Sequence, residues 1–213
     1  MRPELDAYAG RTVLAIGAHP DDLEVAVGGT LARLRRAGAR VVLAVVSIPG
    51  DHATRRKEAE RGADILGGEL RVLLDEPGKR IEDYKNYELV SLLDREVREL
   101  SPAMVLSHGA TEIHRDHRMV HEAVVATQRL RYFDFFTYQP CFCRPVPVEF
   151  HPRLYVDVSP TIDTKMRAIE AHASQFGCRG IDTGIYRDMA RLNGRMVGVA
   201  YAEGLEVGRM LLA

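Results

Sequence analysis

The stretch Val13–Leu34, VLAIGAHPDDLEVAVGGTLARL, contains an apolar run, a polar turn and an amphipathic segment in direct succession. Residues 13–16 are apolar throughout, as expected of a buried parallel strand. Gly17-Ala18 ends this strand, and from about Leu23 to Arg36 the apolar residues recur at helical spacing. The polar turn therefore lies between a strand and a helix. In open α/β sheets, ligands bind at this edge, beyond the carboxyl ends of the strands.

The turn itself, His19-Pro20-Asp21-Asp22, has two interpretations. Proline and acidic residues favour a helix start, where they suit the first turn and the positive end of the helix dipole. A helix cap uses only one carboxylate, however, which leaves the second carboxylate and the imidazole unexplained. A second cluster, His114-Arg115-Asp116-His117, follows another apolar strand candidate. Two clusters of good metal ligands at strand ends favour a metal site over two helix caps.

The rest of the chain alternates between the two kinds of pattern. Further strands are predicted at 40–46, 69–74, 102–107 and 154–158, and further helices at 55–66, with Thr54 as the cap, 86–100 and 117–129. This alternation predicts an α/β fold, a Rossmann-like mostly parallel sheet with helices on both faces. There is no G-x-G-x-x-G motif, and Gly28-Gly29 is expected to permit close packing inside the first helix.

The length of 213 residues predicts a single domain with an elaborated C-terminal third. We place the Rossmann-like core at about 11–131 and a segment that shapes a pocket or an interface at about 132–213. Aromatic residues cluster at 132–142, where core packing or a subunit interface is favoured over a platform for sugar stacking. We expect a homo-oligomer.

Composition excludes several classes of protein. The formal net charge is -1 and no basic run with interleaved aromatic residues occurs, so we expect no nucleic-acid partner. An N-terminus too polar for a signal peptide and the lack of a long apolar run predict a cytoplasmic protein without membrane insertion. Three cysteines without C-x-x-C spacing form neither a disulfide framework nor a zinc ribbon.

The two clusters can supply a catalytic metal site. Catalytic zinc takes three protein ligands and leaves one position open, and His19, Asp22 and His117 form one of its standard ligand sets. Asp21 would then be free to take a proton from a water whose pKa falls to about 7 on the metal. The same ligand set suits Fe²⁺, so Zn²⁺ is expected and Fe²⁺ is the alternative.

Two further residues could assist such a reaction. His114 could stabilise the developing oxyanion or protonate the leaving amine, and Asp116 could orient and charge the His114 imidazole. A site of this kind hydrolyses an amide or ester with metal-activated water and without a covalent intermediate.

Three motifs resemble the signature of the PIG-L/LmbE-like N-deacetylases: Ala18-His19-Pro20-Asp21-Asp22, Gly28-Gly29 and His114-x-Asp116-His117. This metal-dependent family removes acetyl groups from N-acetylglucosamine-containing molecules. The resemblance extends to Arg55-x-x-Glu58 and, in the C-terminal third, to Tyr201-Ala202-Glu203. The Asp-Asp-x-Glu form of the first motif is similar to the bacillithiol-type deacetylases, which together with the mycothiol-type enzymes belong to the family.

The resemblance implies three kinds of role: metal ligands for His19, Asp22 and His117, catalysis for Asp21, His114 and Asp116, and a substrate contact for Arg55. The choice of His117 over His114 as a ligand depends on this resemblance. It assigns no role to His108, His121 or His172.

The sequence therefore predicts a zinc-dependent N-deacetylase that acts on an N-acetylated amino sugar in a small conjugate or glycan. Two alternatives remain. One is a non-catalytic Rossmann-like protein that binds a sugar or nucleotide and holds a structural metal. The other is a metal-dependent hydrolase of a different amide.

Overall fold

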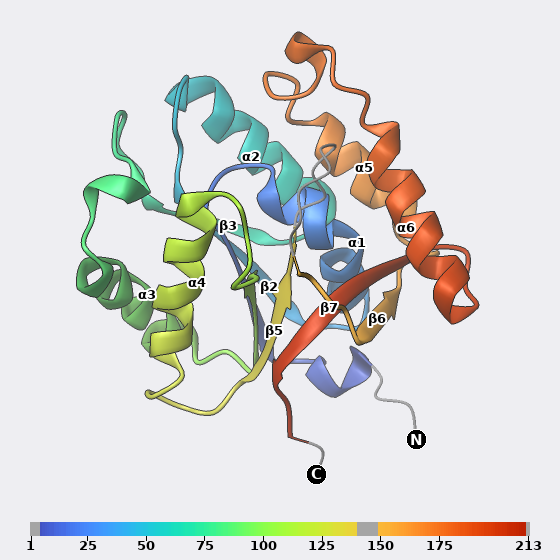
Figure 1. The fold of residues 1–213 in the computed structure, drawn as a ribbon, viewed down its shortest axis with the longest axis horizontal. Coiled ribbons are helices and arrows are strands. Elements are labelled where there is room, and N and C mark those ends of the chain that lie inside the picture. The colour runs from blue at the N-terminus through green and yellow to red at the C-terminus, as the bar shows by residue number, and fades with distance from the viewer. Residues whose placement is uncertain (1–4, 140–148, 212–213) are drawn as a thin grey trace.

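The computed structural model describes residues 5–139 and 149–211, and within them seven strands form one sheet in the order β3-β2-β1-β4-β5-β7-β6 (Figure 1). The strands are β1 (Thr12–Gly17), β2 (Arg40–Ser47), β3 (Glu69–Leu74), β4 (Met104–His108), β5 (Asp134–Tyr138), β6 (Leu154–Asp157) and β7 (Ala202–Arg209). Strands β1 to β5 are parallel, whereas β7 is antiparallel to both β5 and β6. The prediction of a mostly parallel sheet is confirmed.

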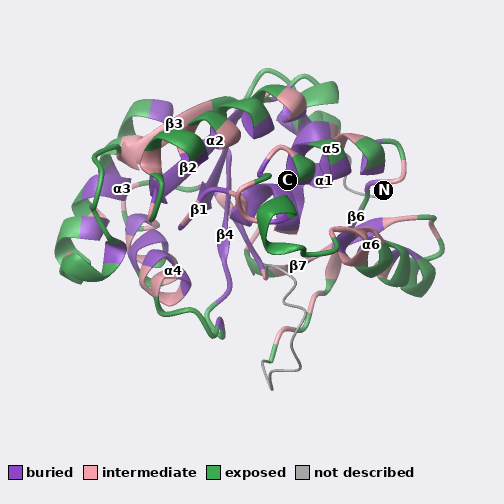
Figure 2. Ribbon diagram, turned by 90° about the horizontal axis from the view of Figure 1, so that it is seen from above, coloured by how far each residue is buried: buried purple, intermediate pink, exposed green. Residues whose placement is uncertain are grey.

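Helices cover both faces of this sheet (Figures 1 and 2). One face carries α1 (Asp22–Arg36), α2 (His52–Leu66) and α5 (Ile162–Glu170), and the other carries α3 (Asn86–Leu100) and α4 (Arg115–Thr127). Helix α6 (Gly184–Val197) packs beside β7. Short 3-10 helices are η1 (Leu5–Tyr8), η2 (Ile81–Asp83) and η3 (Gly177–Arg179). None of the described helices is both long and apolar enough to cross a membrane.

Strand β1 is buried on both of its sides, which explains its continuous apolar run. Val13 and Ala15 belong to the apolar cluster beneath α1 and α2, whereas Leu14 and Ile16 belong to the cluster beneath α3 and α4. Figure 2 shows β1, β2 and β4 buried between the two helical layers. Because β1 pairs in parallel with β4, the turns that follow these two strands meet at the same sheet edge.

Two predicted helix starts are wrong by two or three residues. Helix α2 begins at His52, and its cap is Asp51, whose carboxylate accepts hydrogen bonds from the backbone N–H (3.2 Å) and the hydroxyl (2.8 Å) of Thr54. Thr54 lies inside the first turn, so it is the donor to the cap and not the cap itself. Helix α4 begins at Arg115, because His114 takes the cap position.

Strands β5 and β7 were not predicted. Strand β5 lies within the aromatic cluster at 132–142, and its Phe135, Phe136 and Tyr138 are buried in the core, as the packing interpretation predicts. Residues 140–142 of that cluster lie outside the described residues. Strand β7 contains two glycines, which weaken a strand pattern, and its pairing with β5 and β6 overrides this weakness.

Gly28-Gly29 permits close packing, as predicted. A Cβ atom on Gly29 would lie 2.8 Å from the side chain of Val158. Helix α1 also departs from helical geometry at Val27, where φ is -133°. The backbone N–H groups of Gly29 and Thr30 donate instead to the carboxylate of Glu203 on β7, at 2.9 and 2.7 Å.

Candidate metal centre

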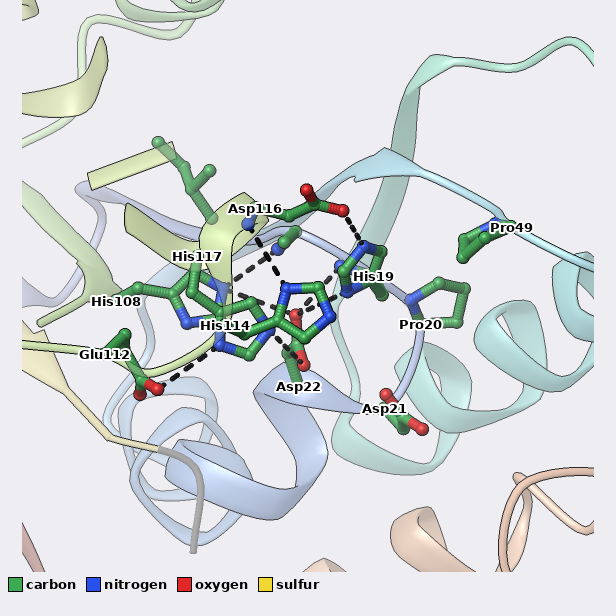
Figure 3. Close-up of polar contacts among 12 residues, drawn as sticks. His19, Pro20, Asp21, Asp22, Pro49, His108, Glu112, His114, Asp116 and His117 are labelled. Atoms are coloured by element: carbon green, nitrogen blue, oxygen red, sulfur yellow. Dashed lines mark hydrogen bonds and ion pairs between the residues drawn. The ribbon is translucent and has the colours of Figure 1, made fainter. Parts of the chain in front are cut away.

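Three of the predicted site residues converge at the edge where β1 and β4 end (Figure 3). His19 and Asp22 come from the turn between β1 and α1, and His117 comes from the first turns of α4. One ligand atom from each of these three residues lies within 4.8 Å of the other two. Their side chains are only 11%, 9% and 3% exposed, respectively. The structure therefore brings together the set that the sequence predicts as metal ligands.

Asp22 lies at the centre of the three. Its Oδ2 is 3.9 Å from Nδ1 of His19, and its Oδ1 is 3.4 Å from Nε2 of His117. Burial by itself raises the pKa of Asp22, but the charge of His117 and contacts with His108 and His117 outweigh it and hold that pKa well below its ordinary value. Burial likewise lowers the pKa of His117, yet the carboxylates of Asp22 and Glu112 raise it to about 10. Two imidazole nitrogens and one carboxylate oxygen fit a divalent cation.

A carboxylate lies behind each of the two imidazoles. Asp116 Oδ2 is 2.9 Å from Nε2 of His19, and Glu112 Oε2 is 3.5 Å from Nδ1 of His117. Each imidazole thus turns its other nitrogen toward Asp22 (Figure 3). Metal-binding histidines commonly have such a carboxylate partner, which fixes the tautomer and the ring orientation. Sequence reasoning missed Glu112, and the only local signal was an acidic residue five positions before His117.

Asp116 contacts a different histidine from the one expected. The sequence suggested that its carboxylate orients His114, but that carboxylate contacts His19, and only the backbone N–H of Asp116 donates to Nδ1 of His114, at 3.2 Å. The reason is helix geometry: His114 is the cap of α4 and accepts from the backbone two residues later, which directs the Asp116 side chain toward the β1 turn.

His114 is placed to act as a hydrogen-bond donor. Because its Nδ1 accepts from the backbone, the proton of the neutral ring lies on Nε2. Burial, followed by the charges of His117 and His19, lowers the pKa of His114 and favours this neutral form. Its ring stacks on that of His117, with the centroids 4.7 Å apart.

Asp21 is at the cap position of α1, yet its side chain forms no capping hydrogen bond. Its backbone is left-handed, with a φ of 94°, a conformation that costs a non-glycine residue on the order of 1–3 kcal/mol. Burial and then the charge of Asp22 raise the pKa of Asp21 to about 7. The capping interpretation of this turn therefore does not account for Asp21, whose carboxylate remains available to the pocket.

Arg55 lines the same pocket, but its guanidinium is already engaged. Its two terminal nitrogens donate to the backbone carbonyls of Pro49 (2.8 Å) and Pro20 (3.1 Å), and Nη2 is 3.9 Å from Oδ2 of Asp21. Arg55 thus ties the loop after β2 to the turn that carries Asp21. The substrate contact expected of Arg55 remains a prediction.

The three histidines without an assigned role lie outside the ligand trio. His108 is fully buried, accepts a hydrogen bond from the backbone N–H of Ala18 at 3.0 Å, and stacks on His117 with centroids 3.9 Å apart. Burial, followed by the charge of His117, lowers the pKa of His108 to about 4, so its ring is neutral. His121 Nδ1 lies 2.8 Å from the His108 carbonyl, and His172 is buried 3.2 Å from Glu24. His108 therefore supports His117 from below.

The site opens into a pocket of about 540 Å³. Besides His19, Asp21, Asp22, Arg55, His114, Asp116 and His117, its lining includes Ser47, Pro49, Arg80, Glu82, Arg115, Gln175 and Arg179. The residues from Ser47 to Arg179 in this second list were not predicted as a set, because they come from four loops and helix ends that are distant in sequence. Arg115, inside the second histidine cluster, had a sequence signal.

Comparisons with known proteins identify the family of this chain. The family model PIG-L, described as GlcNAc-PI de-N-acetylase, matches residues 14–128. The chain is 28% identical to the diacetylchitobiose deacetylase of Thermococcus kodakarensis over 92% of this chain and 82% of that protein. It is 27% identical to the probable N-acetyl-alpha-D-glucosaminyl L-malate deacetylase 2 of Bacillus anthracis, over 79% of this chain and 83% of that protein. Among solved structures, the conserved protein TT1542 of Thermus thermophilus is similar, with a TM-score of 0.80, 26% identity and coverage of 95% and 97%.

Proposed function

The chain belongs to the PIG-L (GlcNAc-PI de-N-acetylase) family, and from this membership and the site geometry we propose that it is a metal-dependent hydrolase that removes the acetyl group from an N-acetylglucosamine-containing small conjugate or glycan. The observation that carries the proposal is the buried trio of His19, Asp22 and His117 beside an Asp21 carboxylate that the helix does not use. Metal ligands alone would also suit a binding protein. A carboxylate that takes no part in the helix cap and belongs to a residue with a strained backbone, next to these ligands, supports catalysis.

His19, Asp22 and His117 would hold the cation, and the donor set favours Zn²⁺, with Fe²⁺ as the alternative. The bound cation supplies Lewis-acid activation of the acetyl carbonyl and of the attacking water. Asp116 and Glu112 would hold the imidazoles of His19 and His117 in the orientation that metal binding requires.

The chain's own residues move the protons. Asp21 takes a proton from the water as it attacks the acetyl carbonyl, because its carboxylate lines the pocket without a capping hydrogen bond. His114 donates a hydrogen bond from Nε2–H to the oxygen of the tetrahedral species, because its Nδ1 already accepts one from the helix backbone. The proton held by Asp21 is then available to the departing amine. The products are acetate and a free amino sugar.

The first test measures primary-amine release from N-acetylglucosaminyl glycosides by metal-loaded and chelator-treated protein in parallel. We expect release only with metal, and restoration when Zn²⁺ or Fe²⁺ is added back; the more active metal identifies the better cofactor. Binding of the glycosides without any release would favour the non-catalytic alternative. Release from other N-acetyl compounds but from none of the glycosides would favour a hydrolase of a different amide.

Several expectations from the sequence stay predictions. Light scattering of the purified protein gives its molar mass and so tests the expected homo-oligomer. Fractionation of cells tests the expected cytoplasmic location. The division between a core at about 11–131 and a C-terminal segment at about 132–213 predicts that loops of the second part alter substrate preference more than metal affinity.

A further inference from the structure

The pocket lining includes arginines that no carboxylate of the lining faces. Each of the four carboxylates in its lining already faces a basic side chain: Asp22 faces His117 at 3.4 Å, Asp116 faces His19 at 2.9 Å, Glu82 faces Arg80 at 2.9 Å, and Asp21 faces Arg55 at 3.9 Å. Two further arginines, Arg115 and Arg179, line the same pocket. Neither has an acidic partner among residues 5–139 and 149–211.

These two arginines line the pocket from different elements of the fold and are both exposed. Arg115 is the first residue of α4, where the amino end of a 13-residue helix adds partial positive charge. Arg179 ends η3. Burial lowers the pKa of Arg55, the charges of Asp21 and Asp22 oppose this, and the charge of Arg179 lowers it further. Two exposed guanidiniums without acidic partners in the lining of one pocket make it a favourable place for an anion.

We propose that Arg115 and Arg179 bind an anionic group, a carboxylate or a phosphate, on the part of the substrate that is attached to the N-acetylated sugar. This inference depends on the proposed function, because it takes the acetamide to lie at Asp22 and His117 on the pocket floor. The remainder of the substrate then extends toward the two exposed arginines. A guanidinium matches carboxylate and phosphate oxygens with two parallel hydrogen bonds, so arginine is suited to this recognition.

The test compares two isosteric glycosides that differ in charge. Carboxymethyl N-acetylglucosaminide carries a carboxylate, and carbamoylmethyl N-acetylglucosaminide carries an uncharged amide in its place; N-acetylglucosamine 1-phosphate supplies the phosphate arm. Amine release is measured for wild type, Arg115→Gln, Arg179→Gln and a control, Arg95→Gln, which changes an exposed arginine of α3 outside the pocket. Metal content is measured for every variant, because Arg115 lies beside two residues of the site.

We expect wild type to prefer an anionic glycoside over the amide. Arg115→Gln and Arg179→Gln should each lower kcat/KM for that anion about 10- to 100-fold, the loss typical of a hydrogen bond to a charged group. Activity on the amide should stay within about twofold, and Arg95→Gln should change neither. The anion with the larger loss, carboxylate or phosphate, identifies the group that is bound. Arg179→Lys should lose less activity on the anion than Arg179→Gln, because lysine keeps the positive charge but lacks the planar guanidinium.

The inference and the proposed function fail in different ways. Equal losses on the charged and uncharged glycosides, or no loss on either, would overturn the anion site and leave deacetylation intact. If no glycoside releases amine, the proposed function fails, and calorimetry with the same three compounds still decides the anion site. Tighter binding of an anion that Arg179→Gln abolishes would support it, and equal or absent binding would overturn it.

Discussion

Two buried polar clusters contact α1, one at its first residue, Asp22, and one at Gly29 and Thr30 in its middle, and they differ in how their charges are satisfied. In the clamp formed by Lys165 and Glu203, the carboxylate accepts from Lys165 Nζ at 2.6 Å and from the backbone N–H groups of Gly29 and Thr30. In the candidate metal centre, by contrast, Glu112 is buried and faces Nδ1 of His117 at 3.5 Å, and no group among residues 5–139 and 149–211 comes within hydrogen-bond distance of either of its oxygens.

The difference indicates what each cluster is for. A buried charge that is fully paired and hydrogen-bonded by the protein serves the fold, because nothing else is needed to offset its desolvation. Carboxylate oxygens and imidazole nitrogens that converge in a buried cluster offer the ligand atoms that a divalent cation binds. We therefore expect changes in the clamp to alter stability, and changes in the metal centre to alter metal binding and catalysis.

The largest effect is expected for Asp21→Asn, which should lower kcat by about 10²–10⁴-fold while the protein keeps its metal, since the amide cannot take the proton. Amine-release kinetics and metal analysis of the same samples measure this. Wild-type kcat in Asp21→Asn would contradict its assignment as the base, whereas loss of the metal would show that Asp21 belongs with the ligands.

In the clamp, Lys165→Met should lower the free energy of unfolding by about 3–5 kcal/mol, because it leaves a buried carboxylate without its cation. Urea unfolding of the metal-free protein measures it. The double variant Lys165→Met/Glu203→Gln should recover part of this loss. Metal affinity of the folded variant should match wild type, and a parallel fall in affinity would remove the distinction between the clusters.

Glu112→Gln provides the converse test inside the metal centre. The amide keeps the shape but loses the negative charge behind His117, so metal affinity should fall about 10–100-fold. Competition with a chelator of known affinity measures this. The control is His121→Gln, which changes a histidine on α4, the helix that carries His117, outside the ligand trio. Unchanged affinity would mean that Glu112 does not position His117.

The smallest effect is expected for Thr161→Val, which removes the buried hydrogen bond from the Thr161 hydroxyl to the Gly29 carbonyl at 2.8 Å. Loss of one such bond should lower the free energy of unfolding by about 1 kcal/mol. Urea unfolding detects this change, and amine release by the folded protein should be unaffected. A change in kcat would show that the break in α1 at Val27 is coupled to the metal centre.

Sequence reasoning predicted the parts of the molecule that depend on local patterns. The third strand, 69–74, and the helix at 86–100 match β3 and α3 residue for residue, because apolar periodicity and flanking turn residues define both. It also predicted which residues meet at the sheet edge, since parallel strands place their carboxyl ends together. It missed β5 and β7, whose pairing depends on strands far away in the chain.

The sequence by itself determined the sheet class and predicted that His19, Asp22 and the second histidine cluster meet at one sheet edge, because residue chemistry and strand-end position are both readable along the chain. The choice of His117 over His114 as a ligand came from the family resemblance. Only the tertiary structure decided which carboxylate faces which imidazole, Asp116 to His19 and Glu112 to His117. It also decided which arginines stay unpaired. These partnerships depend on side-chain directions at helix ends and on neighbours distant in sequence, and a local pattern carries neither.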